Sequence, residues 1–276
     1  MSKTPVEWLL VLFKLLAASG AGVLAFVGIS EFLGGRKRTN LIAIIIALVM
    51  IVVGGGLAVL KVGNPSSVMA AAANIRTGAP VSLEFLACGL TLVVGVIYLF
   101  VQRQEGPASK VLGCASVLGA VAVGYTTGYS HQAMVGTPVW NTPAIPFGFL
   151  FGALLLGGFI YLALSARDGT DGLSKVFVWI VAGLAVLTTL VTGVHGFAAP
   201  LDDRLFLYLA LTPLVGGVGS LLAAVLYARS ASLVWAALGI LTAVVGGLAF
   251  RAFVWVIVKP GLLSFLDTSA YGQFFS

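Results

Sequence analysis

The chain has 276 residues, of which 60% are hydrophobic and only 9% are charged, with a formal net charge of +6. Soluble globular domains carry roughly 25% charged residues, so this composition and a mean hydropathy of +1.11 exclude a soluble globular protein. The excess of basic residues sits in short loops between apolar runs, a pattern typical of membrane topology and not of nucleic-acid binding.

Apolar runs of about 20 residues, the length that a helix needs to cross a bilayer, follow one another along the chain. We predict an all-α integral membrane bundle in a single domain, residues 1–276. Its eight spanning helices are expected near 8–33, 41–60, 82–101, 111–129, 144–166, 175–194, 205–227 and 232–257. The 35 glycines agree with this fold, because small residues let membrane helices approach closely. The first run is too long for a cleavable signal peptide, so we expect it to be retained.

The basic residues are distributed unequally between the two sides of the predicted bundle. The loops after spans one, three, five and seven hold eight of them: Arg36, Lys37, Arg38, Arg103, Lys110, Arg167, Lys175 and Arg229. The other side holds five: Lys3, Lys61, Arg76, Arg204 and Lys259. Because the more basic side faces the cytoplasm, we expect both termini to face outward.

The connections on the outward side are the longer ones, and two of them have informative sequences. The alanine run in 66–77 favours a short interfacial helix. The segment 137–146 contains three prolines, which are incompatible with a regular helix. We expect this segment to lie against the membrane surface, with Trp140 as an interfacial anchor.

Ionisable residues at membrane depth are costly and therefore suggest function. Glu84 opens the third span and Lys61 ends the second, so the two are expected to meet near the outward face. Arg251 lies well inside the eighth span and needs a partner, for which Glu84 and Glu31 are candidates. Lys14 is expected to extend its side chain to the membrane surface. For Lys61, Glu84 and Arg251, function and structural pairing both remain open.

Few residues suit a metal or a cofactor. The two histidines, His131 in the loop after span four and His195 after span six, are expected to form hydrogen bonds near the outward face, with one shared haem as the alternative. Cys88 and Cys114 lie in apolar runs and are expected to pack there. Two thiols are fewer than the roughly four that an Fe–S cluster needs. We therefore expect no resident cofactor.

Quinol oxidation is one chemistry that these residues suit. A quinol loses two protons and two electrons, and its hydroxyls need polar partners in a pocket that is otherwise apolar. The Glu84 carboxylate would accept a proton, and Lys61 would stabilise negative charge on a quinol oxygen. The same residues, with Arg251, would equally suit the path of a polar solute, so the residues alone leave both functions open.

Several segments, in order along the chain, resemble the membrane anchor subunit of the dimethyl sulfoxide reductase family. They are EWLLVLF at 7–13 with GAG at 20–22, KVGNP at 61–65, NIRTG at 74–78, SLE at 82–84, the stretch 129–149 with PVW at 138–140 and PFGF at 146–149, and FRAF at 250–253.

The resemblance implies a haem-free anchor in the cytoplasmic membrane of a bacterium, the cell inner membrane. It would oxidise menaquinol in anaerobic respiration and tether an Fe–S electron-transfer subunit and a molybdopterin catalytic subunit. The segments 61–81 and 130–143 would dock these partners and roof the quinol pocket. The expected quinol-binding residues are Lys61, Gly63, Pro65, Arg76, Glu84 and Arg251, with Glu84 as the catalytic one.

At one position the chain departs from the family pattern, in which the motif of the second loop begins with histidine. Lys61 stands there in this chain. Either the lysine binds a quinone oxygen while Glu84 takes the proton, or the site has moved. A purely structural anchor and a secondary transporter are the alternative functions. Prolines that lie mostly at span ends and the lack of an internal repeat disfavour the transporter.

Overall fold

The structure is a computed structural model that describes residues 7–62, 74–102, 107–133, 140–166, 171–198 and 205–256. Its helical elements are α1 (Trp8–Leu33), α2 (Lys37–Val62), η1 (Asn74–Thr77), α4 (Pro80–Val101), α5 (Pro107–Gln132), α6 (Ala144–Ser165), α7 (Asp171–Ala198), α8 (Leu205–Leu209), η3 (Ala210–Gly219), α9 (Ser220–Ser230) and α10 (Leu233–Val256). Within these residues eight helices are long and apolar enough to cross a membrane, the seventh being the continuous run of α8, η3 and α9. The predicted all-α membrane class is confirmed.

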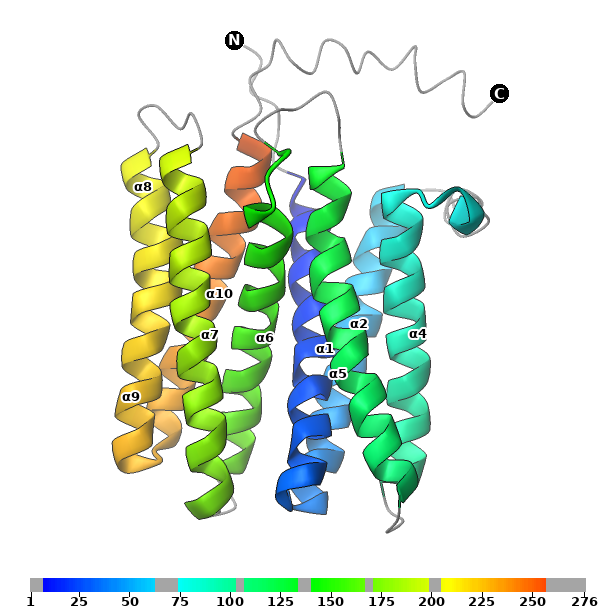
Figure 1. Ribbon diagram of the computed structural model, residues 1–276, viewed down its shortest axis with the longest axis vertical. Coiled ribbons are helices and arrows are strands. Elements are labelled where there is room, and N and C mark those ends of the chain that lie inside the picture. The colour runs from blue at the N-terminus through cyan, green and yellow to red at the C-terminus, as the bar shows by residue number, and fades with distance from the viewer. Residues whose placement is uncertain are drawn as a thin grey trace.

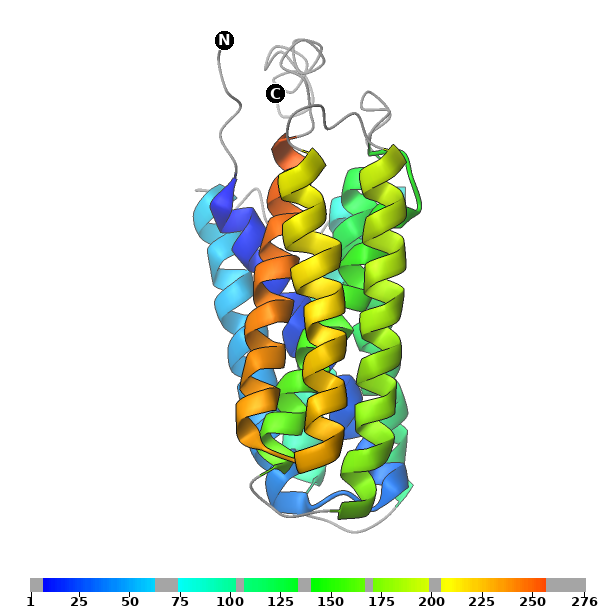
Figure 2. The ribbon, with the colours of Figure 1, turned by 90° about the vertical axis from the view of Figure 1, so that its left-hand side faces the viewer.

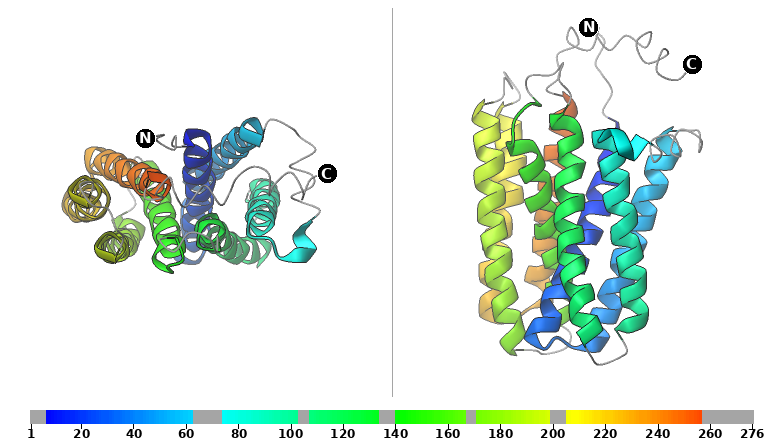
Figure 3. Two further views of the ribbon diagram at one scale, coloured as in Figure 1. Left: turned by 90° about the horizontal axis from the view of Figure 1, so that it is seen from above. Right: turned by 45° about the vertical axis from the view of Figure 1, so that its right-hand side comes forward.

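The eight spanning helices form two groups of four that lie side by side (Figure 1). Helices α1, α2, α4 and α5 make the first group, and α6, α7, α8–α9 and α10 make the second. Figure 2 shows α7, α9 and α10 next to one another in the second group. The view from above in Figure 3 shows an elongated cross-section with α1 near its middle, where α1 contacts α6 of the other group.

Helix α1 is the packing centre of the molecule, with 83% of its most apolar stretch buried. Lipid provides no hydrophobic force that would press helices together, so close packing of small residues has to hold them. At the crossing of α1 and α6, a Cβ on Gly22 would lie 2.6 Å from the carbonyl oxygen of Ala153. A Cβ on Gly157 of α6 would lie 2.6 Å from the backbone nitrogen of Val23. Larger residues would therefore separate the two groups.

A network of hydrogen bonds lies where α1 ends and α2 begins, which is the lower end of the bundle in Figure 1. Gly34 takes a φ of +77°, which ends α1, and the Gly35 N–H donates to the carbonyl oxygen of Ser30 at 2.8 Å. The Asn40 Oδ1 accepts from the Ser30 hydroxyl at 2.8 Å and from the Tyr161 hydroxyl at 2.7 Å. These bonds join α1, α2 and α6 where their apolar packing ends.

Several helices extend beyond the apolar runs that identified them, and this changes the position of both histidines. Helix α5 continues to Gln132 and α7 to Ala198, so His131 and His195 lie in the last helical turns. The expectation that His131 lies in a loop is therefore wrong. A hydropathy run ends at the first polar residue, whereas a helix continues as long as its backbone hydrogen bonds are satisfied inside the protein.

Trp140 does not anchor the chain at the membrane surface. Its side chain is buried, and its indole N–H donates to the Val254 carbonyl oxygen at 2.7 Å. Helix α6 begins soon afterwards, at Ala144, with Pro146 in its first turn, where a missing N–H costs no helical hydrogen bond. Of the expected interfacial helix 66–77, residues 74–77 form the 3₁₀ helix η1, and the rest lie outside the described residues.

The seventh span differs from the regular helix that its apolar run predicts. Its central part, η3, is π-helical and contains Pro213. Proline has no N–H to donate and its ring crowds the preceding turn, and a wider helical turn accommodates both effects. π-Helical turns of this kind occur frequently at functional sites. This proline lies inside a span, unlike most prolines of the chain.

The crossing of α1 and α6 provides a test of the packing. We expect Gly157→Ala to lower the free energy of unfolding by about 1–3 kcal/mol, because the added methyl group meets the backbone of α1. Unfolding of the detergent-solubilised protein by denaturant would measure this loss. The matched control is Gly152→Ala on the same helix, where nothing lies within 4 Å of the added Cβ. Equal stability of the two variants would contradict the assigned packing.

Candidate functional site: a buried ion pair beside an apolar cavity

A lysine and a glutamate form an ion pair inside the first helix group. The Lys14 Nζ of α1 lies 3.4 Å from the Glu84 Oε2 of α4, and both side chains are buried. The expectation that Lys14 extends to the membrane surface is therefore wrong. Its pairing with Glu84 leaves a full opposite charge next to the ammonium group, which is how a buried charge is tolerated.

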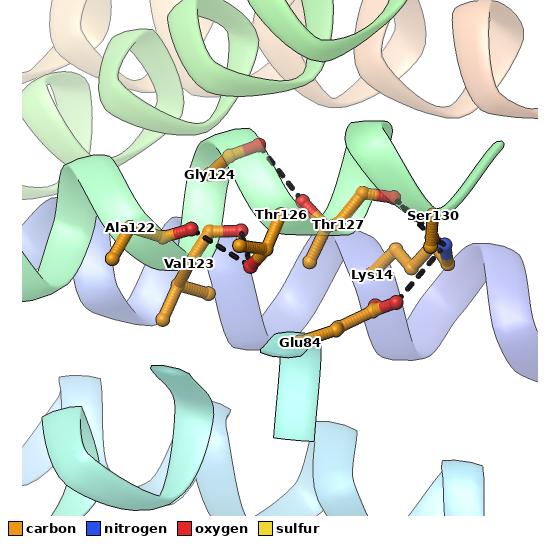
Figure 4. A network of polar contacts seen from close by, with 8 residues as sticks. All are labelled: Lys14, Glu84, Ala122, Val123, Gly124, Thr126, Thr127 and Ser130. Carbon is orange, nitrogen blue, oxygen red and sulfur yellow. Dashed lines mark hydrogen bonds and ion pairs between the residues drawn. The ribbon is translucent and has the colours of Figure 1, made fainter. Parts of the chain in front are cut away.

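Helix α5 supplies the remaining hydrogen bonds of the ammonium group (Figure 4). The Lys14 Nζ donates to the Thr127 carbonyl oxygen at 2.7 Å and to the Ser130 hydroxyl at 2.6 Å. All three donors of the ammonium group are thus directed at oxygen atoms from two other helices. The group is held rigidly between α1, α4 and α5.

The Glu84 carboxylate uses only one of its oxygens in this arrangement. Within the described residues, Oε1 is buried without a hydrogen-bond partner. Glu84 also lines a cavity of about 340 Å³, a volume at the lower end of the range of small-molecule pockets. Glu84 thus has one carboxylate oxygen without a partner among the described residues and lies in the wall of a cavity that has room for a ligand.

The walls of this cavity are mainly apolar and come from both helix groups. Four helices of the first group contribute, and α10 of the second group adds Trp255. The rings of Phe13 and Phe85 are stacked, with centroids 6.4 Å apart. The full lining is Leu10, Phe13, Lys14, Ala58, Lys61, Val81, Glu84, Phe85, Ser130, His131 and Trp255. Such walls suit a flat, lipid-soluble molecule with polar groups at its edge.

Lys61 borders the same cavity as Glu84, but its ion pair is with another residue. Its Nζ lies 2.5 Å from the Glu7 Oε2, and 38% of its side chain is exposed. Lys61 and Glu84 thus line the same cavity, as expected, but they do not pair with each other: Glu84 pairs with Lys14. Lys61 is the penultimate residue of α2 and Glu7 directly precedes α1, so this pair joins the end of α2 to the start of α1.

Arg251 lies deep in the structure without either of the carboxylates expected to pair with it. In the described part of the chain it forms no ion pair with Glu84 or Glu31. Its guanidinium lies over the Phe149 ring, with Cζ 4.5 Å from the centroid, and Nη1 donates to the Gly247 carbonyl oxygen at 3.1 Å. A cation–π contact and one carbonyl oxygen stand where a carboxylate was expected, and Nε and Nη2 have no hydrogen-bond partner among the described residues. Arg251 lines a second cavity, of about 10 Å³, enclosed by the second helix group.

The other expected quinol-binding residues lie away from the described cavity or cannot be placed. Arg76 is exposed on η1, before the start of α4. Gly63 and Pro65 fall outside the described residues. The structure therefore brings together Lys61 and Glu84 of the expected set and adds Lys14, Ser130, His131 and Trp255 to the same cavity.

One signal in the sequence identifies the missed pair. Lys14 lies six residues after the start of α1 at Trp8, and Glu84 lies four residues after the start of α4 at Pro80. Helices one and three of a sequential bundle start at the same side of the membrane. At about 1.5 Å per residue, two opposite charges therefore lie at nearly the same depth, where charges require partners. His131 gives no comparable signal, because its hydropathy resembles that of a loop residue.

The two histidines lie in different surroundings. His131 borders the large cavity, whereas the Nδ1 of His195 lies 3.0 Å from the hydroxyl of Tyr208. In the described ranges no three His, Cys, Asp or Glu residues group to hold a metal ion. Cys88 and Cys114 are both free thiols.

Comparison with known proteins gives one family match. The model of the family described as DMSO reductase anchor subunit (DmsC) matches residues 1–200. The matched part includes Lys14, Glu84, Ser130 and His131, and excludes Trp255. No curated protein matches the chain.

The buried pair provides a second test. We expect Lys14→Met to destabilise the protein by about 3–5 kcal/mol, because it leaves the Glu84 charge buried and without a partner. The double variant Lys14→Met/Glu84→Gln should recover much of this loss, since it removes both charges. Lys61→Met, which breaks the partly exposed pair with Glu7, should cost less than about 1 kcal/mol. Unfolding free energies in detergent would measure these three variants together with Glu84→Gln alone. Effects of Lys14→Met and Glu84→Gln that simply add in the double variant would refute the coupling of Lys14 with Glu84.

Proposed function

Because the chain belongs to the family of DMSO reductase anchor subunits, we propose that it anchors such a complex in the membrane and oxidises a quinol for it. The family suggests menaquinol as the quinol, anaerobic respiration as the process and the bacterial cytoplasmic membrane as the location. The partners would be an Fe–S electron-transfer subunit and a molybdopterin catalytic subunit. The chain itself is a multi-pass membrane protein with eight spanning helices.

The observation that carries the proposal is that Glu84, which has one carboxylate oxygen without a partner among the described residues, lines the large apolar cavity. A quinol needs an apolar space for its ring and an acceptor for its hydroxyl proton. Stacked phenylalanines and Trp255 suit the ring, and Oε1 suits the hydroxyl. Lys14, held by α5, suits an oxygen on which negative charge develops.

The first step would be a proton transfer that conserves the charge of the site. The O–H bond of the quinol breaks and a new O–H bond forms at Glu84 Oε1. The carboxylate becomes neutral and the quinol oxygen becomes the anion, so Lys14 faces one negative charge before and after the transfer. The barrier is lowered because the stabilising cation is already in place and needs no reorganisation.

The electrons have to leave the chain in the next steps. Loss of two electrons, one at a time, and of the second proton converts the quinol anion to the quinone. We propose oxidised Fe–S clusters of the electron-transfer subunit as the acceptor, and water at this end of the bundle as the destination of the second proton. The cavity is lined by the ends of α2 and α5 and the beginnings of α1 and α4. A quinol in it would lie near the bundle end, where a partner can dock.

The transporter alternative gains one observation, the π-helical segment with Pro213 inside the seventh span. The neighbouring cavity at Arg251 measures about 10 Å³, which is room for about one water molecule and not for a solute. The large cavity and the family match both favour the anchor.

The proton acceptor provides a direct test of this function. In the purified complex, we expect Glu84→Gln to lower kcat for quinol oxidation at least about 100-fold, because the amide cannot take the proton. Steady-state oxidation of a short-chain menaquinol analogue would measure the loss. The matched control is Glu31→Gln, which changes a carboxylate that binds Ser109 and Asn40 and does not line the cavity; it should retain activity within about twofold. A wild-type complex that oxidises no quinol would overturn the function, and full activity of Glu84→Gln would remove this residue from it.

A further inference from the structure

We propose that His131 is the second polar contact of the quinol headgroup, through a hydrogen bond between its neutral imidazole and the hydroxyl that does not face Glu84. This inference rests on the proposed function, and it assigns a binding role to a residue that the sequence indicated only as a loop histidine. Its ligand is the hydroxyl group of an aromatic quinol.

The imidazole is buried but has no hydrogen bond to any of the residues that the structure describes. His131 lies at the end of α5, directly after Ser130, and its side chain is 2% exposed. Neither Nδ1 nor Nε2 has a partner among the described residues. A buried polar group left without a partner destabilises the folded protein, so such a group calls for an explanation. A ligand that completes its hydrogen bonding is one.

Aromatic rings surround the imidazole on its protein sides. The ring centroids of Trp140, Phe149 and Trp255 lie 5.1, 5.7 and 5.4 Å from that of His131. Phe149 has no polar atom in its side chain, and the Trp140 N–H is already donated to the Val254 carbonyl oxygen. These rings hold the imidazole in place through apolar contact. The large cavity that His131 borders is where a polar partner has room.

The charges nearby indicate which role the imidazole plays. The Lys14 Nζ and the Arg251 Cζ lie 5.9 and 4.5 Å from the centroid of the Phe149 ring, which itself contacts His131. A third positive charge among these groups would be repelled by both cations. His131 therefore serves as a hydrogen-bond partner that orients the quinol, and Glu84 holds the transferred proton. A neutral imidazole has one donor and one acceptor nitrogen, so it can also bind the carbonyl oxygen of the quinone product.

The position of His131 also bears on the family pattern, in which a histidine stands at the position of Lys61. Lys61 and His131 both line the cavity, the first at the end of α2 and the second at the end of α5. In this chain the imidazole reaches the cavity from a different helix.

The test compares three variants in the intact complex, with kcat and KM measured separately for a short-chain menaquinol analogue. We expect His131→Phe to raise KM about tenfold with kcat within about threefold, because binding is weakened while Glu84 remains. His131→Gln, which restores a hydrogen-bonding side chain, should have a KM within about threefold of the wild type. His195→Phe is the control, since this buried histidine has its own partner in Tyr208 and does not line the cavity; its KM should be unchanged.

The outcomes separate the role of His131 from the proposed function. Any one of three results would overturn the role of His131. The first is an unchanged KM in His131→Phe, and the second is an equal rise of KM in His195→Phe. The third is a KM in His131→Gln as high as that in His131→Phe. Calorimetry of quinone-analogue binding to the same complexes should show about a tenfold loss of affinity in His131→Phe. This measurement also applies to a variant that assembles but turns over too slowly for kinetics. A wild-type complex that binds the quinone but does not oxidise the quinol would overturn the proposed function, and about a tenfold loss of quinone binding in His131→Phe would still support the binding role of His131.

Discussion

The constraint on which this structure depends is that charge inside a membrane protein must be matched within the protein. Lys14 and Glu84 meet this constraint together, and the oxygen atoms of Thr127 and Ser130 complete the shell around the ammonium group. Because these groups come from α1, α4 and α5, the pair also fixes the relative positions of three helices. The match is complete for the lysine and incomplete for the glutamate, because the Glu84 Oε1 has no hydrogen-bond partner among the described residues. The proposed proton transfer depends on this asymmetry, which a purely structural ion pair would not need.

The fold follows from the sequence more directly than the site does. Runs of apolar residues predict the eight helices because a bilayer requires spans of a fixed length, and the structure contains them all. The ends of these helices are less predictable, since helical hydrogen bonding continues past the apolar run, as at His131 and His195. Trp140 is a similar case: a tryptophan at the end of a span suits the membrane surface equally well, and only tertiary packing directs it to Val254.

The candidate site was predictable in part. Glu84 and Lys61 were assigned to one pocket by their places at two helix ends, and both line the cavity. The ion pair of Glu84 with Lys14 is not expected from the sequence, which offers Lys61 and Arg251 as candidates for Glu84. Lys61 and Glu84 flank the same loop, whereas Lys14 lies in another helix and approaches Glu84 only in the folded bundle. Arg251 was expected to need a carboxylate, and it is accommodated by the Phe149 ring and the Gly247 carbonyl oxygen instead. The distance between side chains on two helices depends on how each helix is rotated about its axis. These helices are apolar on nearly all sides, so the sequence alone gives little indication of that rotation.

The large cavity is bounded by helices of both groups, because Trp255 of α10 closes a space that is otherwise lined by the first group. A molecule in this space contacts both halves of the bundle at once. Any ligand that binds the packed form and not a separated one shifts the equilibrium towards the packed form by mass action. Occupancy of the cavity and cohesion of the two halves are thus thermodynamically linked. If the ligand is the proposed quinol, the amount of quinol in the membrane would affect how firmly the two halves of the anchor hold together as well as the rate of its oxidation.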